Sequence, residues 1–238
     1  DAALTAETIL FWLNEAEIPA SGFTRELDTT TLTEHVAGTG KASEGFVNYV
    51  DTLEQLEDAL PKDRVLVTDG GRFMTEVWCR ISVPNPHSFV GTVGFGAIGL
   101  GLQTAIGAAV AAPDQPVVLF SGDGGFMMGG INEFNTAVRL GLNLIVLILN
   151  DNSFGMIRWK QAGMGFSDWG LEYNNPDFIS YAESYGAFGH RIENVEGLGT
   201  TVANAFHTGG VHLIDCPVDY SDNVKDLITD LADHEPII

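Results

Sequence analysis

The stretch PVVLFSGDGG, residues 116–125, decides the fold. Five residues that are mostly apolar are followed by a turn in which one acid, Asp123, stands among glycines. A short apolar run bounded by glycines is typical of a strand buried on both faces of a parallel sheet. Glycines in the turn that follows allow the backbone to turn sharply and to approach a ligand closely. The stretch therefore predicts a buried strand that ends at a binding site.

Outward from this stretch, apolar strands alternate with helical segments. Further strands are predicted over 64–71, 143–151, 189–193 and 211–219, and helices over 49–61, 99–113, 131–142, 175–186 and 197–210. Strands that alternate with helices form a parallel sheet covered on both sides. We therefore predict an α/β fold with a doubly wound, mainly parallel sheet and helices on both faces.

The first 45 residues have a different character. Residues 4–17 predict an amphipathic helix that ends at Pro19–Gly22, and the region 24–45 is polar. We interpret 1–45 as the tail of a preceding middle domain plus a linker, and 46–238 as the α/β domain.

Composition excludes several partners. The chain has 11 basic and 32 acidic residues and a net charge of −21, whereas nucleic acids and anionic membranes require clustered Lys and Arg. We see no apolar run that reaches the roughly 18 residues of a membrane span and no signal peptide. Cys79 and Cys216 lie far apart in apolar surroundings. We expect both to be reduced core thiols in a cytoplasmic protein.

Three predicted strands end in polar turns, at 68–71, 121–125 and 149–153. In such a sheet these turns open onto one edge, where ligands bind. Asp123 and Asp151 each follow an apolar strand there, and Mg²⁺ prefers hard oxygen ligands. We therefore predict a metal site formed by Asp123, Asp151 and the Ser153 carbonyl. Backbone amides at Gly122, Gly124 and Gly125, with a helix that starts after Gly130, would hold phosphate groups.

Other interpretations remain open. Asp123 could cap the next helix, and Asp151 could be an ordinary turn residue. The run GFGAIG, residues 94–99, has the spacing of a dinucleotide-binding loop. The residues before it, VPNPHSFVGT, make a poor strand. We therefore favour the metal–phosphate site over the alternative that the chain is a nicotinamide-dependent oxidoreductase.

The pair GDGG and LNDNSFG resembles the thiamine diphosphate (ThDP) motif, which runs from GDG to an Asn-Asn or Asn-Asp pair. The approach to it, 106–125, fits the longer family pattern, and 64–220 resembles the diphosphate-binding domain of the acetolactate synthase-like branch. The run MMGGINEF, 127–134, is one residue longer than the family pattern, and we interpret it as a helix bulge. It leaves open whether Asp151 or Asn150 is the metal ligand; we favour Asp151.

The resemblance implies further site residues. Ile98 would wedge under the cofactor, the Gly96 carbonyl would accept a hydrogen bond from its amino group, and Met156 would lie beside its thiazolium ring. Plain core packing is the alternative for Ile98 and Met156. The diphosphate would also contact the following residues: Gly70, Gly71, Phe154 and Gly155.

The resemblance also implies an activity, with ThDP and Mg²⁺ as cofactors. We expect acetolactate synthase-like decarboxylation of a 2-oxo acid with carboligation. A pyrimidine-binding domain or subunit would supply the catalytic Glu, and the assembly would be a homodimer or tetramer. The chain would be the C-terminal part of a longer enzyme or one subunit of a split enzyme, and incompetent alone. Alternatives are decarboxylation without ligation, of the benzoylformate or sulfopyruvate type, and a non-catalytic ThDP-fold subunit. The substrate, the acceptor, and the presence of FAD or a regulatory subunit stay open.

Overall fold

The computed structural model describes residues 2–15 and 37–221. They belong to two compact units, 1–35 and 36–238, and each unit is described by itself. In the first, helix α1 spans Ala2–Glu15, which confirms the predicted N-terminal helix. The predicted end of that helix at Pro19–Gly22, and most of the polar region, lie outside the described residues. The assignment of 1–45 to a preceding domain stays a prediction.

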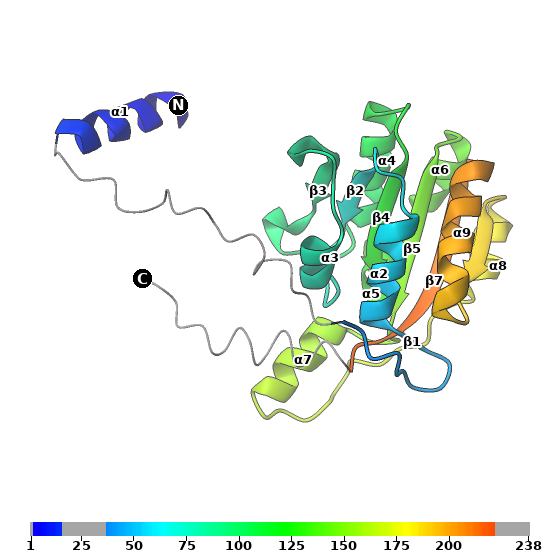
Figure 1. Cartoon of the computed structure of the whole chain (residues 1–238). Coiled ribbons are helices and arrows are strands. Elements are labelled where there is room, and N and C mark those ends of the chain that lie inside the picture. The colour runs from blue at the N-terminus through cyan, green and yellow to red at the C-terminus, as the bar shows by residue number, and fades with distance from the viewer. Residues whose placement is uncertain (1, 16–36, 222–238) are drawn as a thin grey trace. The chain divides into compact units, whose positions relative to one another are not determined.

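The second unit is built on a seven-stranded sheet in which every described pairing is parallel (Figure 1). Its order is β1-β7-β5-β4-β2-β3, and β6 also pairs with β7. The strands are β1 Val47–Asn48, β2 Val65–Thr68, β3 Phe89–Gly91, β4 Val117–Gly122, β5 Leu144–Asn150, β6 Phe188–Arg191 and β7 Val211–Asp219. The predicted parallel sheet is confirmed.

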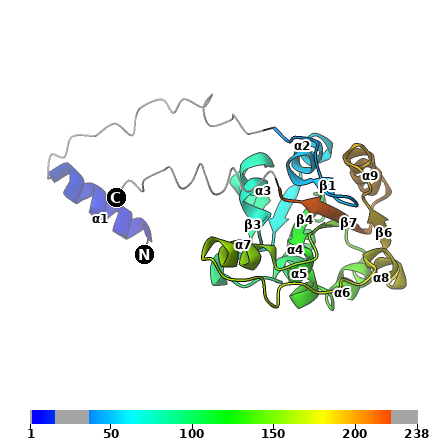
Figure 2. The same ribbon diagram turned by 90° about the horizontal axis from the view of Figure 1, so that it is seen from below.

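Helices cover both faces of this sheet, as Figure 2 shows from below. One face packs against α2 Tyr49–Ala59, α3 Met74–Arg80 and α9 Val195–Thr208. The other face packs against α4 Gly101–Ala111, α6 Phe134–Arg139 and α8 Phe178–Ser184. The sheet is therefore doubly wound, as predicted.

The two cores explain why the central strands are apolar throughout. In β5, Ile145 and Leu147 belong to the core under α2 and α9, whereas Leu144 and Val146 belong to the core under α4 and α8. Successive side chains of a strand point to opposite faces, so a strand covered on both sides has no polar face to present. This burial places the carboxyl ends of β2, β4 and β5 next to one another.

Two local predictions require correction. The poor-strand region contains a strand after all, because β3 pairs with β2 from Leu66↔Phe89 to Thr68↔Gly91. It is a three-residue edge strand, and short edge strands need little apolar sequence. The helix expected over 131–142 is present as α6 but begins at Phe134, and a separate helical turn that was not predicted follows β4 directly, as α5 Asp123–Gly125. A π-helical segment, Phe126–Gly130, follows it, which confirms the predicted bulge.

The two thiols differ from each other. Both cysteines are free, and Cys216 is buried in β7, as predicted, but Cys79 is exposed on α3. The prediction of a core position for Cys79 is therefore wrong, because its apolar neighbours in sequence belong to the other side of a short helix. Among residues 2–15 and 37–221, we find no helix with the length and apolar character needed to cross a bilayer.

Candidate functional site

The predicted strand ends meet at one edge of the sheet. Strand β4 lies between β5 and β2, with Gly122 beside Leu149 and Phe120 beside Thr68. The turns after these three strands therefore line one surface, as the sequence predicts. The candidate site is formed by these turns and by two further segments, 94–99 and 171–175.

Asp123 is the first residue of the helical turn that follows β4. Its side chain is buried, and it accepts a hydrogen bond of 2.6 Å from the amide nitrogen of Asn175. Burial raises its pKa, against the hydrogen bonds that lower it. A carboxylate that is buried at a helix N-terminus suits a cation or a cation-bridged phosphate, because its charge is poorly solvated.

Asp151 lies in the turn after β5 and accepts a hydrogen bond of 3.2 Å from the Ser153 amide. Burial, and next the negative charge of Asp123, raise its pKa to about 6. A carboxylate whose pKa is raised by the charge of a second carboxylate marks a place where a cation is favoured. A Cβ on Gly155 would stand 2.4 Å from an oxygen of Asp151, so this carboxylate requires glycine at that position.

The oxygen atoms here match the ligands that Mg²⁺ takes. Asp123 and Asp151 supply carboxylates, and Ser153 supplies a carbonyl in the same turn. Among the described residues there is no group of three or more His, Cys, Asp and Glu side chains that could hold a metal. A set of two carboxylates and one carbonyl is consistent with that finding, and the chemistry of these donors fits Mg²⁺.

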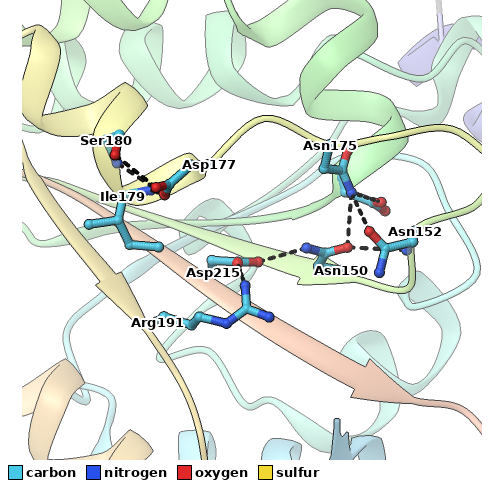
Figure 3. Close-up of polar contacts among 9 residues, drawn as sticks. Asn150, Asn152, Asn175, Asp177, Ile179, Ser180, Arg191 and Asp215 are labelled. Carbon is cyan, nitrogen blue, oxygen red and sulfur yellow. Dashed lines mark hydrogen bonds and ion pairs between the residues drawn. The ribbon is translucent and has the colours of Figure 1, made fainter. Parts of the chain in front are cut away.

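Asn150 is already engaged elsewhere, as Figure 3 shows. Its amide nitrogen donates to Asp215 at 2.9 Å, and its oxygen accepts from the Asn152 amide at 3.1 Å and from Asn175 at 3.0 Å. Asp215 also pairs with Arg191. The assignment of the ligand stays a prediction, and these contacts support Asp151 over Asn150.

Gly124 lies where two other parts of the chain approach the turn after β4 closely. A Cβ there would stand 2.6 Å from the Tyr173 hydroxyl and 3.0 Å from the Phe154 ring. Gly124 and Gly125 form one buried helical turn with Asp123, and Gly122 precedes it. This turn presents a helix N-terminus without side chains at the edge of the sheet, which is the surface that phosphate groups bind.

The loop carrying Gly96 and Ile98 lies beside the turn after β2. A Cβ on Gly70 would be 3.5 Å from the Ile98 side chain, so these two predicted site residues are neighbours. Gly71 follows Gly70 in the same half-buried turn. Gly96 has a φ of 76° and is exposed, which suits the predicted open carbonyl.

Asp69 holds this loop and was missed by the sequence interpretation. Both of its carboxylate oxygens accept from the Gly99 amide at 3.0 Å, and one accepts from the Gly70 amide at 2.7 Å. Asp69 follows an apolar strand in TDGG just as Asp123 follows one in SGDGG. That shared pattern was the signal that could have identified it.

Phe154 and Met156 lie at the start of helix α7, Gly155–Gly163. Met156 is half-buried in the first turn. The Phe154 amide donates to the Leu171 carbonyl at 3.1 Å, and its ring lies 4.9 Å from the Tyr173 ring. The structure thus brings a later segment onto the predicted site, with Tyr173 and Asn175, which no sequence pattern indicated.

A cavity of about 390 Å³ opens beside Asp151. Its lining includes Arg72 and Arg158. The Arg72 guanidinium lies over the Tyr220 ring at 4.6 Å and donates to the Tyr220 carbonyl at 3.2 Å. Two cations near an acidic edge provide positive charge that an anionic ligand can use.

Comparisons with known proteins agree with this geometry. The E. coli K12 protein "Acetolactate synthase isozyme 2 large subunit" is 34% identical over 179 residues, which are 74% of this chain and 32% of that protein. "Acetolactate synthase" of Bacillus subtilis 168 is 37% identical over 132 residues, 56% of this chain and 23% of that protein. The chain thus spans about a quarter to a third of the length of these relatives.

A solved structure shows the same fold. The Rhodococcus jostii RHA1 ThDP-dependent 4-hydroxybenzoylformate decarboxylase superposes with a TM-score of 0.70 at 22% identity, over 78% of this chain and 35% of that one. Residues 69–216 match the family described as "Thiamine pyrophosphate enzyme, C-terminal TPP binding domain", where thiamine pyrophosphate is another name for ThDP. This match covers more than half of the chain and includes Asp123, Asp151 and Ser153. The chain therefore belongs to the thiamine pyrophosphate enzyme family, through its C-terminal TPP-binding domain.

Proposed function

We propose that this chain supplies the diphosphate- and Mg²⁺-binding half of an enzyme that decarboxylates a 2-oxo acid and ligates the product to a second carbonyl compound, as acetolactate synthases do. The observation that carries the proposal is the convergence of Asp123, Asp151 and the Ser153 carbonyl at the edge of the sheet, within a family that binds ThDP. The sequence relatives named acetolactate synthase support the carboligating branch.

The chain's own residues would bind and orient the cofactor. Asp123, Asp151 and the Ser153 carbonyl would hold Mg²⁺, and the amides of the Gly122–Gly125 turn would hold the diphosphate. When bound, ThDP supplies the electron sink for decarboxylation.

The remaining predicted residues would shape the reactive end of the site. Ile98 would support the bent cofactor from below, the Gly96 carbonyl would accept a hydrogen bond from its amino group, and Met156 would pack beside the thiazolium ring. The proximity of Gly70 to the Ile98 side chain supports this arrangement, because Ile98 lies beside a turn that is predicted to hold the diphosphate.

A second polypeptide region would complete the site. A pyrimidine-binding domain with a catalytic Glu would come from another part of the protein or from a neighbouring subunit, in a homodimer or tetramer. Support comes from the coverage, because the chain corresponds to about a third of the E. coli relative. We place the enzyme in the cytoplasm, which suits its two free thiols.

A second candidate is decarboxylation without ligation. Its support is the fold neighbour named 4-hydroxybenzoylformate decarboxylase and a relative named "Probable 2-ketoarginine decarboxylase AruI" from Pseudomonas aeruginosa, 29% identical over 163 residues. Product analysis separates the candidates: with pyruvate, the carboligating enzyme yields acetolactate, whereas a simple decarboxylase yields acetaldehyde.

The first experiment is native mass spectrometry of the protein as isolated, with ThDP and Mg²⁺ added. We expect both ligands to bind together when the pyrimidine-binding region is present. Asp123→Asn should abolish this binding, because it removes one of the two carboxylate charges that hold the cation. Asp114→Asn, on an exposed turn before β4, is the matched control and should bind normally.

Two results would contradict the proposal. If Asp123→Asn binds ThDP and Mg²⁺ as tightly as the unmodified protein, Asp123 is not a ligand. If the 238-residue chain alone decarboxylates pyruvate, the site does not need a second region.

A further inference from the structure

The segment Leu171–Asn175 lies across the proposed metal ligands. An isolated antiparallel bridge joins Ser153 to Glu172, and the Phe154 amide donates to the Leu171 carbonyl at 3.1 Å. The rings of Phe154 and Tyr173 pack at 4.9 Å. Three contacts of different kinds therefore hold this segment against the turn that carries the Ser153 carbonyl.

Tyr173 directs its hydroxyl group at two of the proposed ligands. It donates to the Ser153 carbonyl at 3.1 Å, and the Asp123 carboxylate lies near enough that, after burial, it raises the pKa of Tyr173. A phenol has one proton to share between these two acceptors. A cation bound by Asp123 and the Ser153 carbonyl would compete with this hydroxyl for the same oxygen atoms.

The same hydroxyl lies in the glycine turn that is predicted to hold phosphate. The position of a Cβ on Gly124 is only 2.6 Å from it, so Tyr173 is pressed against that backbone. The hydroxyl therefore lies next to the turn that is predicted to hold the diphosphate.

Asn175 contacts Asp123 from another direction. Its amide nitrogen donates at 2.6 Å to Asp123. The same nitrogen donates at 3.0 Å to Asn150 and at 3.1 Å to Asn152, as Figure 3 shows. These partners tie Asn175 to the turn after β5. It can keep the Asp123 carboxylate oriented while the Tyr173 hydroxyl moves.

We propose that Tyr173 is a positioning residue whose hydroxyl competes with the cation for Asp123 and the Ser153 carbonyl: it orders these ligands when no cation is bound and gives way when Mg²⁺ and the diphosphate bind. This inference rests on the proposed function. It predicts that the hydroxyl competes with the cation, so that removing it tightens cation binding. If Tyr173 only shaped the site, removing its hydroxyl would weaken cation binding.

The test is Tyr173→Phe, which removes the hydroxyl and keeps the ring that packs on Phe154. Binding of Mn²⁺ is measured by electron paramagnetic resonance at saturating ThDP, with Mg²⁺ as competitor, in the assembly that includes the pyrimidine-binding region. We expect the Kd for the cation to fall about two- to tenfold, the range of one hydrogen bond. Tyr181→Phe is the matched control, because the Tyr181 hydroxyl donates to the Ile131 carbonyl and not to a proposed ligand. The Kd of this variant for the cation should not change.

The outcomes separate the two proposals. If the unmodified assembly binds no cation with ThDP, the proposed function fails and this inference with it. If the unmodified assembly binds the cation but Tyr173→Phe binds it equally or more weakly, only this inference is overturned.

Folding of the variant is also informative. If Tyr173→Phe folds only when ThDP and Mg²⁺ are added, the result supports the inference, because the hydroxyl is then needed only when no cation is bound. If it fails to fold in both conditions, the hydroxyl has a purely structural role and the inference is overturned.

Discussion

Gly124 shows how a single missing side chain serves the candidate site. Gly124→Ala would place a Cβ 2.6 Å from the Tyr173 hydroxyl and 3.0 Å from the Phe154 ring, so both neighbours would have to move. We expect a loss of about 1–3 kcal/mol in the free energy of unfolding, measured in urea, and weaker ThDP binding. A variant as stable as the unmodified chain would show that the turn has spare room.

Gly107→Ala is the control for that measurement. Gly107 lies on the exposed side of α4, and a Cβ there would meet nothing within 4 Å. Alanine favours the helix by about 1 kcal/mol over glycine, so this variant should be more stable. If the free energy of unfolding falls for Gly124→Ala and rises for Gly107→Ala, the loss at Gly124 is caused by steric crowding and not by helix propensity.

Asp219 gives the chain an acid-sensitive contact. Partial burial raises its pKa, but hydrogen bonds from Ser221 and Ser43 outweigh burial and lower the pKa to about 2. Because the folded pKa lies below the unfolded value, the folded state binds fewer protons between about pH 4 and 2. The stabilisation is therefore present above about pH 4 and is lost as the pH falls toward 2.

Asp219→Asn tests this pH dependence. The free energy of unfolding of the variant should fall less steeply between about pH 4 and 2 than that of the unmodified chain. Ser43→Ala should give an intermediate slope, because the Ser43 amide still donates to Asp219 at 2.7 Å. Identical slopes for all three proteins would exclude Asp219 as the source.

Among the elements, the helical turn after β4 combines two tasks. It begins at Asp123 without an intervening loop, and its π-helical continuation takes up the extra residue that the sequence comparison had indicated. Such π segments are frequent at functional sites, because an inserted residue re-aims the side chains before it. Here the insertion leaves Asp123 at the edge of the sheet while Phe126 and Phe134 fill one core.

Helix α2, strand β2 and the end of α3 are joined by one buried cation, Arg64. Its guanidinium is 1% exposed and donates to Glu57 at 2.5 Å, to the Pro61 carbonyl at 2.9 Å and to the Ser82 carbonyl at 2.5 Å. Arg64→Ala would remove the guanidinium from all three acceptors, and Glu57 would keep its contacts with Ser82 and Lys62. We expect a loss of about 3–5 kcal/mol in the free energy of unfolding.

Lys62 is the matched control, because it pairs with the same Glu57 at 3.5 Å but its side chain is 76% exposed. Lys62→Ala should cost under about 1 kcal/mol, the range of surface pairs. If denaturant unfolding gives equal losses for Lys62→Ala and Arg64→Ala, burial is not what makes the Arg64 contact strong.

In the molecule as a whole, the sheet gathers residues that are far apart in the chain. Asp123 and Asn175 are separated by 52 positions and Asp69 and Gly99 by 30, yet each pair forms hydrogen bonds at the same edge. Neighbouring parallel strands bring their carboxyl ends together whatever connects them. The site is thus a property of strand order, with β4 between β5 and β2.

Much of this architecture could be predicted because it is written in local patterns. Apolar runs predicted β4, β5 and β7, and the helical periodicity predicted α2, α4 and α9. The acids at the strand ends, Asp123 and Asp151, were identified for the same reason, since the end of a buried strand is visible within ten residues of sequence. The family resemblance followed from that spacing and was confirmed by the match over residues 69–216.

Other features were decided only by tertiary structure. Nothing local in NNPDF indicates that Asn175 reaches Asp123, and nothing in LEY indicates that the Tyr173 hydroxyl reaches the Ser153 carbonyl. The edge strand β3 and the exposed side of Cys79 were likewise decided by neighbours in space. Local sequence determines periodicity and turn chemistry, whereas contacts between distant segments depend on how the helices pack on the sheet, which no single segment encodes.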